Sequence, residues 1–507
     1  MANNISTLDE ISQLQLDERL KIRACGIGNL PTEILALIFS MVHSQSLSSS
    51  TTKFTTSDAV LRLSHVNSIW RETCISFSRL WSHIHIICAS RNEAERIQLF
   101  LERSGTSSLT IDFYAPEGVD LYHPEIIGVI QKLFDACGRW KEASFSAEAQ
   151  SLEQVAMILS GDNNLPQLAQ RFNFPLLEKL AFIHPLGSQN RPFLDIFQQK
   201  STPKLRTLVI PSYTTFLPFA FDQITSLQLL KTNSVLLPRI CTQLVELEIG
   251  QTFGEFSELI PSAVAFEMPK VETLTVTFSG SGRLWNMLTL PSLRNFILEA
   301  ITFMPLEYIA VLNMLRRSGC GPSLRRLNLA GMDAQAVDVE SMLILMPQLE
   351  ELVLKETLMR QQRILTPRLL TTLRLPNSQY LSVIDTSAIS PATPSEYKST
   401  SSRSRIIPDL VRIELHIYYF PKFRLDLLFD MLLSRIVISD GSSLSAVKGH
   451  STSGALKSVR LCFIMQKSDP PDQVPVELEN MVNRLRLAST SQIHSTVRCE
   501  QVWRKEI

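Results

Sequence analysis

A leucine-rich motif recurs along most of this chain and restricts what the chain can fold into. From Leu177 onward the pattern Leu-x-x-Leu-x-Leu, with Ile, Val or Phe at some apolar positions, occurs eleven times in order. Its last two apolar positions are two residues apart, so on a β-strand both side chains point the same way. A single short strand cannot bury them. We therefore expect an α/β fold in which successive strands stack in parallel over one core, while the intervening segments return along the outside.

The spacing of the copies is typical of a repeat architecture. Separations run from 19 residues (Leu205 to Ile224) to 46 residues (Leu410 to Leu456). Most lie near the ~20–29 residues of leucine-rich repeats, which the motif resembles. The resemblance implies a solenoid over residues 87–465 with parallel strands on its concave face. The copies begin at Leu177, Leu205, Ile224, Leu244, Val271, Leu293, Leu324, Leu349, Leu370, Leu410 and Leu456.

The repeats are degenerate. Leucine-rich repeats usually carry an Asn three residues beyond Leu-x-Leu, whereas Leu329 is followed by Ala330-Gly331-Met332. An ordinary α/β domain with Leu-rich strands is the alternative interpretation. Between two copies, residues 306–319 predict a helix whose apolar face ends before Gly319.

Alternation along each strand places the residue between the two apolar positions on the concave face. Those residues mix charged, polar and apolar types, which favours a protein partner over a polyanion. They are Val209, Gln228, Glu248, Thr275, Ile297, Asn328, Val353, Arg374, Glu414 and Arg460. We predict target contacts at Glu248, Asn328, Arg374, Glu414 and Arg460; solvated strand positions without a partner are the alternative.

Three segments depart from the repeat pattern. Residues 385–405 and 440–454 are rich in Ser and Thr and read as insertions in the solenoid. Residues 466–507 are expected to form a C-terminal cap or tail, with an amphipathic helix between Val476 and Leu485.

The N-terminal part predicts a small helical module. Pro31 suits the first turn of a helix because its φ is fixed and its missing N–H has no partner there. The apolar residues that follow share one helical face: Ile34, Leu35, Ile38, Phe39 and Val42. Ser57 or Asp58 can cap a second helix, and a further stripe comprises Ala59, Leu63, Val66 and Trp70. The module has more apolar surface than it can bury internally, so we expect it to dock against a partner.

This module resembles the F-box, and its sequence is most similar to those of fungal F-box proteins. The matching residues are Leu30-Pro31-x-Glu33-Ile34-Leu35-x-x-Ile38-Phe39, then Leu61-x-Leu63-x-x-Val66-x-x-x-Trp70-Arg71, then Leu80-Trp81. The resemblance implies an F-box domain over residues 27–86, preceded by a lead-in over 1–26 that can be helical. An unrelated three-helix module is the alternative.

The resemblance also implies a function. An F-box binds a Skp-type adaptor, which is held by a cullin scaffold, and the repeats would bind a protein for ubiquitylation. The chain would then be the substrate-recognition subunit of an SCF-type ubiquitin ligase; a Skp-bound scaffold without a ubiquitylation role is the alternative. The residues expected to contact the adaptor are Leu30, Pro31, Ile34, Leu35, Ile38, Leu61, Leu63, Val66 and Trp70.

Composition narrows the classes of protein to which this chain can belong. Lys and Arg together number 49, as do Asp and Glu, so no global field attracts nucleic acid or an anionic membrane. No apolar run approaches the ~18 residues of a membrane span, and the N-terminus lacks a signal-peptide pattern. The eight cysteines form no C-x-x-C pair, which indicates reduced thiols in the cytoplasm or nucleus rather than a zinc site.

No catalytic motif is found. The chain has no glycine-rich phosphate loop and no Gly-x-Ser-x-Gly elbow. His83 and His85 share a strand face, but no further ligand lies at metal-binding spacing. We therefore expect a non-catalytic protein without cofactor or metal.

Overall fold

A computed structural model of the chain describes residues 30–48, 56–88, 93–161, 168, 170–186, 190–211, 217–231, 240–251, 265–278, 283–300, 308–330, 336–356, 364–374, 407, 409–418, 424–435, 456–465 and 494–501. The chain divides into two compact units, Met1–Ala220 and Phe221–Ile507. Within the described ranges, no helix has the length and apolar character needed to cross a membrane.

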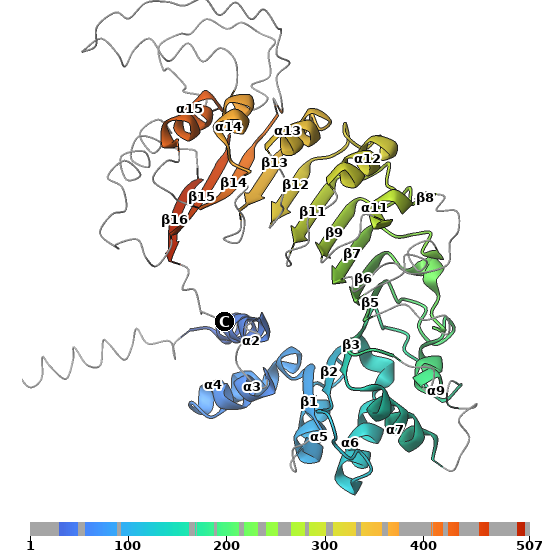
Figure 1. The fold of residues 1–507 in the computed structure, drawn as a ribbon. Coiled ribbons are helices and arrows are strands. Elements are labelled where there is room, and N and C mark those ends of the chain that lie inside the picture. Colours follow the sequence, from blue (N-terminus) through green and yellow to red (C-terminus); the bar gives the residue numbers. More distant parts are fainter. Residues whose placement is uncertain are drawn as a thin grey trace, which may run out of the picture. The chain divides into compact units, whose positions relative to one another are not determined.

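In the described part of the first unit, three helices are followed by alternating strands and helices (Figure 1). Its strands β1 to β5 lie in chain order, and each is parallel to the next. The elements are α2 (Thr32–Ser48), α3 (Thr56–Ser64), α4 (Ser68–Ser76), η2 (Ser78–Trp81), β1 (His83–Ile87), α5 (Glu93–Arg103), β2 (Leu109–Tyr114), α6 (Pro124–Asp135), η3 (Cys137–Arg139), β3 (Trp140–Ser146), α7 (Ala149–Ser160), β4 (Lys179–Phe182), α9 (Arg191–Leu194), η5 (Asp195–Phe197) and β5 (Thr207–Ile210).

Aromatic side chains fill the core between these strands and helices. The rings of Trp140 and Phe134 lie 4.9 Å apart edge to face, and those of Phe145 and Phe193 lie 5.2 Å apart in the same geometry. Such pairs add about 0.5–1.5 kcal/mol beyond the area that they bury.

The second unit is also α/β, with helices α11 to α15 along one side of its strands (Figure 1). Its main strands follow the order β6-β7-β9-β11-β12-β13-β14-β15-β16 and are parallel; β8 and β10 form a separate parallel pair. The elements are η6 (Phe221–Gln223), β6 (Ser226–Lys231), β7 (Glu246–Gln251), β8 (Phe266–Glu267), β9 (Thr273–Phe278), α11 (Arg283–Met287), β10 (Leu288–Thr289), β11 (Asn295–Ala300), α12 (Tyr308–Ser318), β12 (Arg326–Ala330), α13 (Ala336–Ile344), β13 (Glu351–Lys355), α14 (Pro367–Leu373), β14 (Arg412–Tyr418), α15 (Leu425–Arg435), β15 (Ser458–Met465) and β16 (His494–Gln501).

The prediction of an α/β fold with stacked parallel strands is confirmed. Ten of the eleven motif copies place their last two apolar positions on a strand, from β4 to β15. On β9, Leu274 and Val276 are fully buried while Thr275 between them is partly exposed. The helix expected within 306–319 is also present as α12, and Gly319 follows it with φ +62°.

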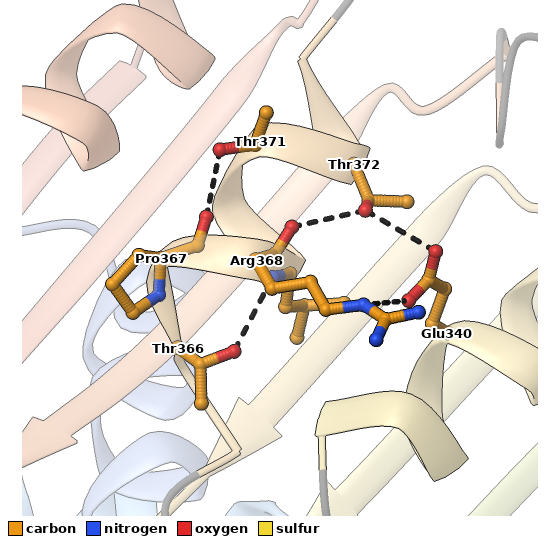
Figure 2. Close-up of polar contacts among 7 residues, drawn as sticks. Glu340, Thr366, Pro367, Arg368, Thr371 and Thr372 are labelled. Atoms are coloured by element: carbon orange, nitrogen blue, oxygen red, sulfur yellow. Dashed lines mark hydrogen bonds and ion pairs between the residues drawn. The ribbon is translucent and has the colours of Figure 1, made fainter. Parts of the chain in front are cut away.

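The sequence prediction of a strand is wrong for the ninth copy of the motif. Its positions Leu370 and Leu373 lie on helix α14, not on a strand, and β13 pairs directly with β14. Thr366 caps this helix by accepting a hydrogen bond from the backbone N–H of Leu369, and Pro367 occupies the first turn (Figure 2). Leu369, Leu370 and Leu373 are buried together, because this spacing also fits one helical face.

A second contact holds α14 against the preceding helix. Arg368 Nε donates to Glu340 Oε2 of α13 at 2.9 Å, and Thr372 Oγ1 donates to Glu340 Oε1 at 3.4 Å (Figure 2). Arg374, predicted on a strand, is instead the C-cap residue of α14. Its predicted place on a strand is therefore wrong.

The predicted ends of the repeat region also differ from the observed elements. The boundary at residue 86 falls inside β1, which pairs with β2 and so belongs to the sheet. Within the predicted cap or tail, β16 extends the sheet by pairing with β15. The predicted lead-in (1–26), the two insertions (385–405 and 440–454) and the helix between Val476 and Leu485 lie outside the described residues.

Arg435, the last residue of α15, is 1% exposed and joins separate parts of the second unit. Its Nε donates to the carbonyl of Leu373 at 2.7 Å, and its Nη1 donates to that of Ile407 at 2.8 Å. Its own carbonyl accepts from the N–H of Leu456 at 3.0 Å. Burial lowers the pKa of Arg435 to about 10, so the guanidinium remains charged at neutral pH. One side chain therefore ties α14 to the residues that precede β14.

Gly321, in the turn before β12, lies where two successive α/β segments approach each other closely. A Cβ at this position would overlap the backbone oxygen of Leu345, which follows α13. We expect Gly321→Ala to destabilise the protein by about 1–3 kcal/mol because the two turns must move apart. Thermal unfolding measures the effect. Gly128→Ala in α6 is the control: its Cβ meets nothing within 4 Å, so a gain of about 0.5–1 kcal/mol is expected. Equal midpoints for the two variants would contradict the prediction.

Candidate functional site

Helix α2 begins as the sequence predicts. The carbonyl of Pro31 accepts hydrogen bonds from the N–H groups of Ile34 and Leu35, each at 3.0 Å. Pro31 therefore stands immediately before the first helical residue, Thr32. The fixed φ of proline orders the first turn without loss of a hydrogen bond.

The second predicted stripe spans two helices rather than one. Helix α3 ends at Ser64, and α4 starts at Ser68, capped by Asn67, whose Oδ1 accepts from the N–H of Trp70 at 2.8 Å. The stripe from Ala59 to Trp70 is thus interrupted, because Asn67 satisfies the first turn of a new helix. Ser57 and Asp58, the predicted caps, lie inside α3, which begins at Thr56.

Helix α2 carries apolar side chains on two opposite sides. Leu35 and Phe39, four residues apart, are fully buried, and the ring of Phe39 packs against Trp70 at 4.9 Å. The sequence pattern placed Ile34 and Val42 on one face with Leu35 and Phe39, but both are 42% exposed, so that expectation is wrong for these two residues. Ile34 instead shares the other side with Leu37 and Met41, which follow at spacings of three and four. Leu37 and Met41 are 61% and 62% exposed. A helix that is apolar all round is ordinarily covered on both sides.

The following helices add more exposed apolar side chains. Val66 is 57% exposed, and Ile69 and Ile75 of α4 are each 45% exposed. Trp70 is half-buried, and its Nε1 is buried without a hydrogen-bond partner among the described residues. We call the exposed apolar side chains of this region the helical patch: Ile34, Leu37, Met41, Val42, Val66, Ile69 and Ile75.

The structure sorts the nine residues predicted to contact an adaptor. Pro31, Ile34 and Val66 are exposed, and Leu35 is fully buried, so Leu35 packs the module internally. The half-buried residues are Leu30, Ile38, Leu61, Leu63 and Trp70. Sequence reasoning did not single out Leu37 and Met41. Their spacing from Ile34 was the available signal, since it marks a second apolar side of the helix.

Four of the five predicted target residues, all except Arg374, lie in one row across the second unit. Parallel register places the residues of this row side by side on successive strands, on the face opposite the buried leucines. We call this the strand face; its central row is Gln228, Glu248, Thr275, Ile297, Asn328, Val353, Glu414 and Arg460. Val209 lies on β5 of the first unit and is buried.

Ion pairs organise the strand face over β12 to β15. Glu351 contacts both Arg326, at 3.2 Å, and Arg412, at 2.9 Å. Glu414 contacts His416 at 2.7 Å and Arg460 at 3.6 Å. Each carboxylate is thus shared by two basic side chains from the same or neighbouring strands.

This arrangement changes the acidity of Glu414. Partial burial raises the pKa of its carboxyl. The hydrogen bond with His416 and the charges of Arg460, His416 and Lys355 lower the pKa by more, so the resulting pKa lies below the ordinary value of 4.5. The carboxylate is therefore ionised and stabilises the basic side chains around it.

Asn328 lies at the centre of the row and differs from its neighbours. It is 7% exposed, and its Oδ1 has no hydrogen-bond partner within the described part of the chain. Ile297 and Val353 flank it on the adjacent strands. A buried amide oxygen without a donor is uncommon in folded proteins.

Two buried thiols and a histidine of the described residues have defined environments. Burial raises the pKa of Cys88 and of Cys241 to about 12, so both thiols stay protonated at neutral pH. His83 Nε2 lies 2.6 Å from Asp112 Oδ2. Across the described ranges, no three His, Cys, Asp or Glu side chains lie together in a way that could hold a metal ion.

Comparison with known proteins gives no family for this chain: no family model matches its sequence, and no curated protein matches it significantly. The arrangement of side chains is therefore the basis for assigning a function.

The pKa of Glu414 leads to a prediction about pH. Its folded-state value lies below the ordinary value, so its stabilisation is present above about pH 4.5 and is lost as the pH falls through the folded-state pKa. We expect Glu414→Gln to lower stability by about 1 kcal/mol at pH 7. The difference from the wild type should shrink in thermal melts below pH 4.5. Glu246→Gln, at an exposed carboxylate on β7, is the control; an equal loss in both variants, independent of pH, would refute the assignment.

Proposed function

We propose that this chain is the substrate-recognition subunit of an SCF-type ubiquitin ligase. Its N-terminal helices would form an F-box that binds a Skp-type adaptor, and the strands of a leucine-rich-repeat solenoid would bind the target protein on their concave face. The observation that carries the proposal is the second, exposed apolar side of α2, formed by Ile34, Leu37 and Met41.

The helical patch supports the adaptor-binding part of the proposal. Leaving several large aliphatic side chains exposed on one short helical module is unfavourable in water. Patches of this kind mark sites of protein–protein interaction. The patch lies within the segment that resembles an F-box, and two of its members, Ile34 and Val66, are among the matching residues.

The strand face supports the target-binding part. It is formed by side chains from eight neighbouring strands in fixed register, which gives an extended and rigid surface. The chain would contribute no bond chemistry itself. Holding a target near a charged conjugating enzyme raises the effective concentration of the reacting groups.

A charge-bearing double variant tests adaptor binding. We expect Ile34→Asp with Leu37→Glu to weaken binding to a purified Skp-type adaptor by at least about tenfold, because both changes place charge in an apolar contact. The fold should survive, since both positions are exposed and an acidic residue suits the first turn of a helix. Isothermal titration measures the affinity.

Met157→Asp is the matched control for that titration. Met157 lies on α7 of the same unit and is 42% exposed, as is Ile34. Its variant should bind the adaptor as the wild type does. A folded double variant with wild-type affinity would refute the assignment of the patch.

The same double variant separates a ligase subunit from a Skp-bound scaffold. Proteins that co-purify with the wild-type chain should become more abundant when the double variant replaces it in the host, and proteasome inhibition should reproduce that increase. Quantitative mass spectrometry measures both. Unchanged abundance of every bound protein would favour the scaffold.

A further inference from the structure

The centre of the strand face contains an acceptor that the protein itself does not satisfy. Asn328 is only 7% exposed, and its Oδ1 has no hydrogen-bond donor among the described residues. An unpaired buried acceptor lowers stability relative to an apolar side chain of similar shape. The oxygen itself is buried, so a donor from outside the chain would remove that cost only once the side chains around it move aside.

The two residues in register with Asn328 carry no side-chain donor. Adjacent strands lie about 4.8 Å apart, and the residues in register on either side are Ile297 and Val353. Val353 is 4% exposed. Asn328 is therefore a single polar group within a short apolar strip that crosses β11, β12 and β13.

In the arginine ion pairs over β12 to β15 the guanidinium is the more exposed partner, whereas in the Lys355–Glu299 pair, which joins β13 and β11, the carboxylate is the more exposed, at 41% against 33%. The side chain of Arg412 is 60% exposed, whereas that of its partner Glu351 is 16% exposed. Arg460 is likewise 48% exposed against 24% for Glu414. Because the carboxylates lie lower than the guanidinium groups, a molecule approaching over β14 and β15 meets positive charge first.

The opposite end of the strand face differs in sign. On β7 the outward side chains include Glu246 and Glu248, and Glu248 accepts a hydrogen bond from Gln228 Nε2 at 2.8 Å. No basic side chain lies between Glu246 and Gly250 on that strand. The positive side of the strip is therefore the side towards β15.

We propose that the strand face binds an extended, acidic segment of the target protein. A backbone N–H of this segment donates to Asn328 Oδ1, an aliphatic side chain covers Ile297 and Val353, and one or more carboxylates lie beside Arg412 and Arg460. This inference rests on the proposed function, because it names the chemical class of the target that the strand face recognises.

The test uses the full-length chain and a displayed library of random 12-residue peptides, from which the best binders are synthesised with a fluorescent label. We expect the selected peptides to combine Asp or Glu with a nearby aliphatic residue. Fluorescence anisotropy should show that Asn328→Leu weakens binding by at least about tenfold. Its melting temperature should equal or exceed that of the wild type, since the unpaired acceptor is gone.

A modified peptide and a double variant of the protein identify which groups form the hydrogen bond and the ionic contacts. N-methylation of one backbone nitrogen in the peptide should weaken binding to the wild type and have no further effect on Asn328→Leu. Arg412→Gln with Arg460→Gln should weaken binding of the acidic peptides and reduce its salt dependence. Asn313→Leu, the same substitution on the exposed side of α12 and outside the strand face, is the matched control and should bind as the wild type does.

The inference would be overturned by the selection of no peptide, by the selection of basic peptides, or by wild-type affinity in Asn328→Leu. A lower melting temperature for Asn328→Leu would also overturn it, because Asn328 would then be satisfied by water and have a structural role. Adaptor titration separates this outcome from the proposed function, since Asn328→Leu should bind the adaptor normally. Peptide binding by a wild-type chain that ignores every adaptor would refute the proposed function alone.

Discussion

Parallel pairing between successive strands is the interaction on which the rest of this protein depends. Each motif copy has two apolar side chains on one side of a strand that is too short to bury them alone, and pairing with the next strand gives them a shared core. The pairing also sets the register of the opposite side. Because Leu327 lies beside Phe296 and Leu352, Asn328 must lie beside Ile297 and Val353. Burial of one face thus determines which side chains meet on the other.

The same constraint explains what could be predicted from the sequence. A two-residue period of apolar positions identifies strands reliably when the residues between them are polar, as on β9 with Thr273, Thr275 and Thr277. It failed at Leu370, because the spacing of Leu369, Leu370 and Leu373 also fits a helix and Thr366-Pro367 supplies its start. The motif alone could not distinguish the two outcomes; the cap could have done so.

The candidate surfaces were predicted less completely than the fold. The apolar positions of α2 were identified from the sequence, but which of them are buried depends on packing against Trp70 and α3. Leu35 therefore turned inward while Leu37 stayed exposed. Likewise, the composition of the central row suggested a protein partner, yet the unpaired oxygen of Asn328 and the shared carboxylates of Glu351 and Glu414 become apparent only when neighbouring strands are in register.

In our proposal the two surfaces have separate tasks: the helical patch would attach the chain to its adaptor, and the strand face would select a target. Hydrogen–deuterium exchange with a purified Skp-type adaptor tests the central part of this account most directly, because it reports which backbone amides are protected by the contact. The account predicts added protection over α2 and α4, with exchange over β11 to β15 unchanged. No added protection on those helices at saturating adaptor, or protection confined to the strands, would contradict it.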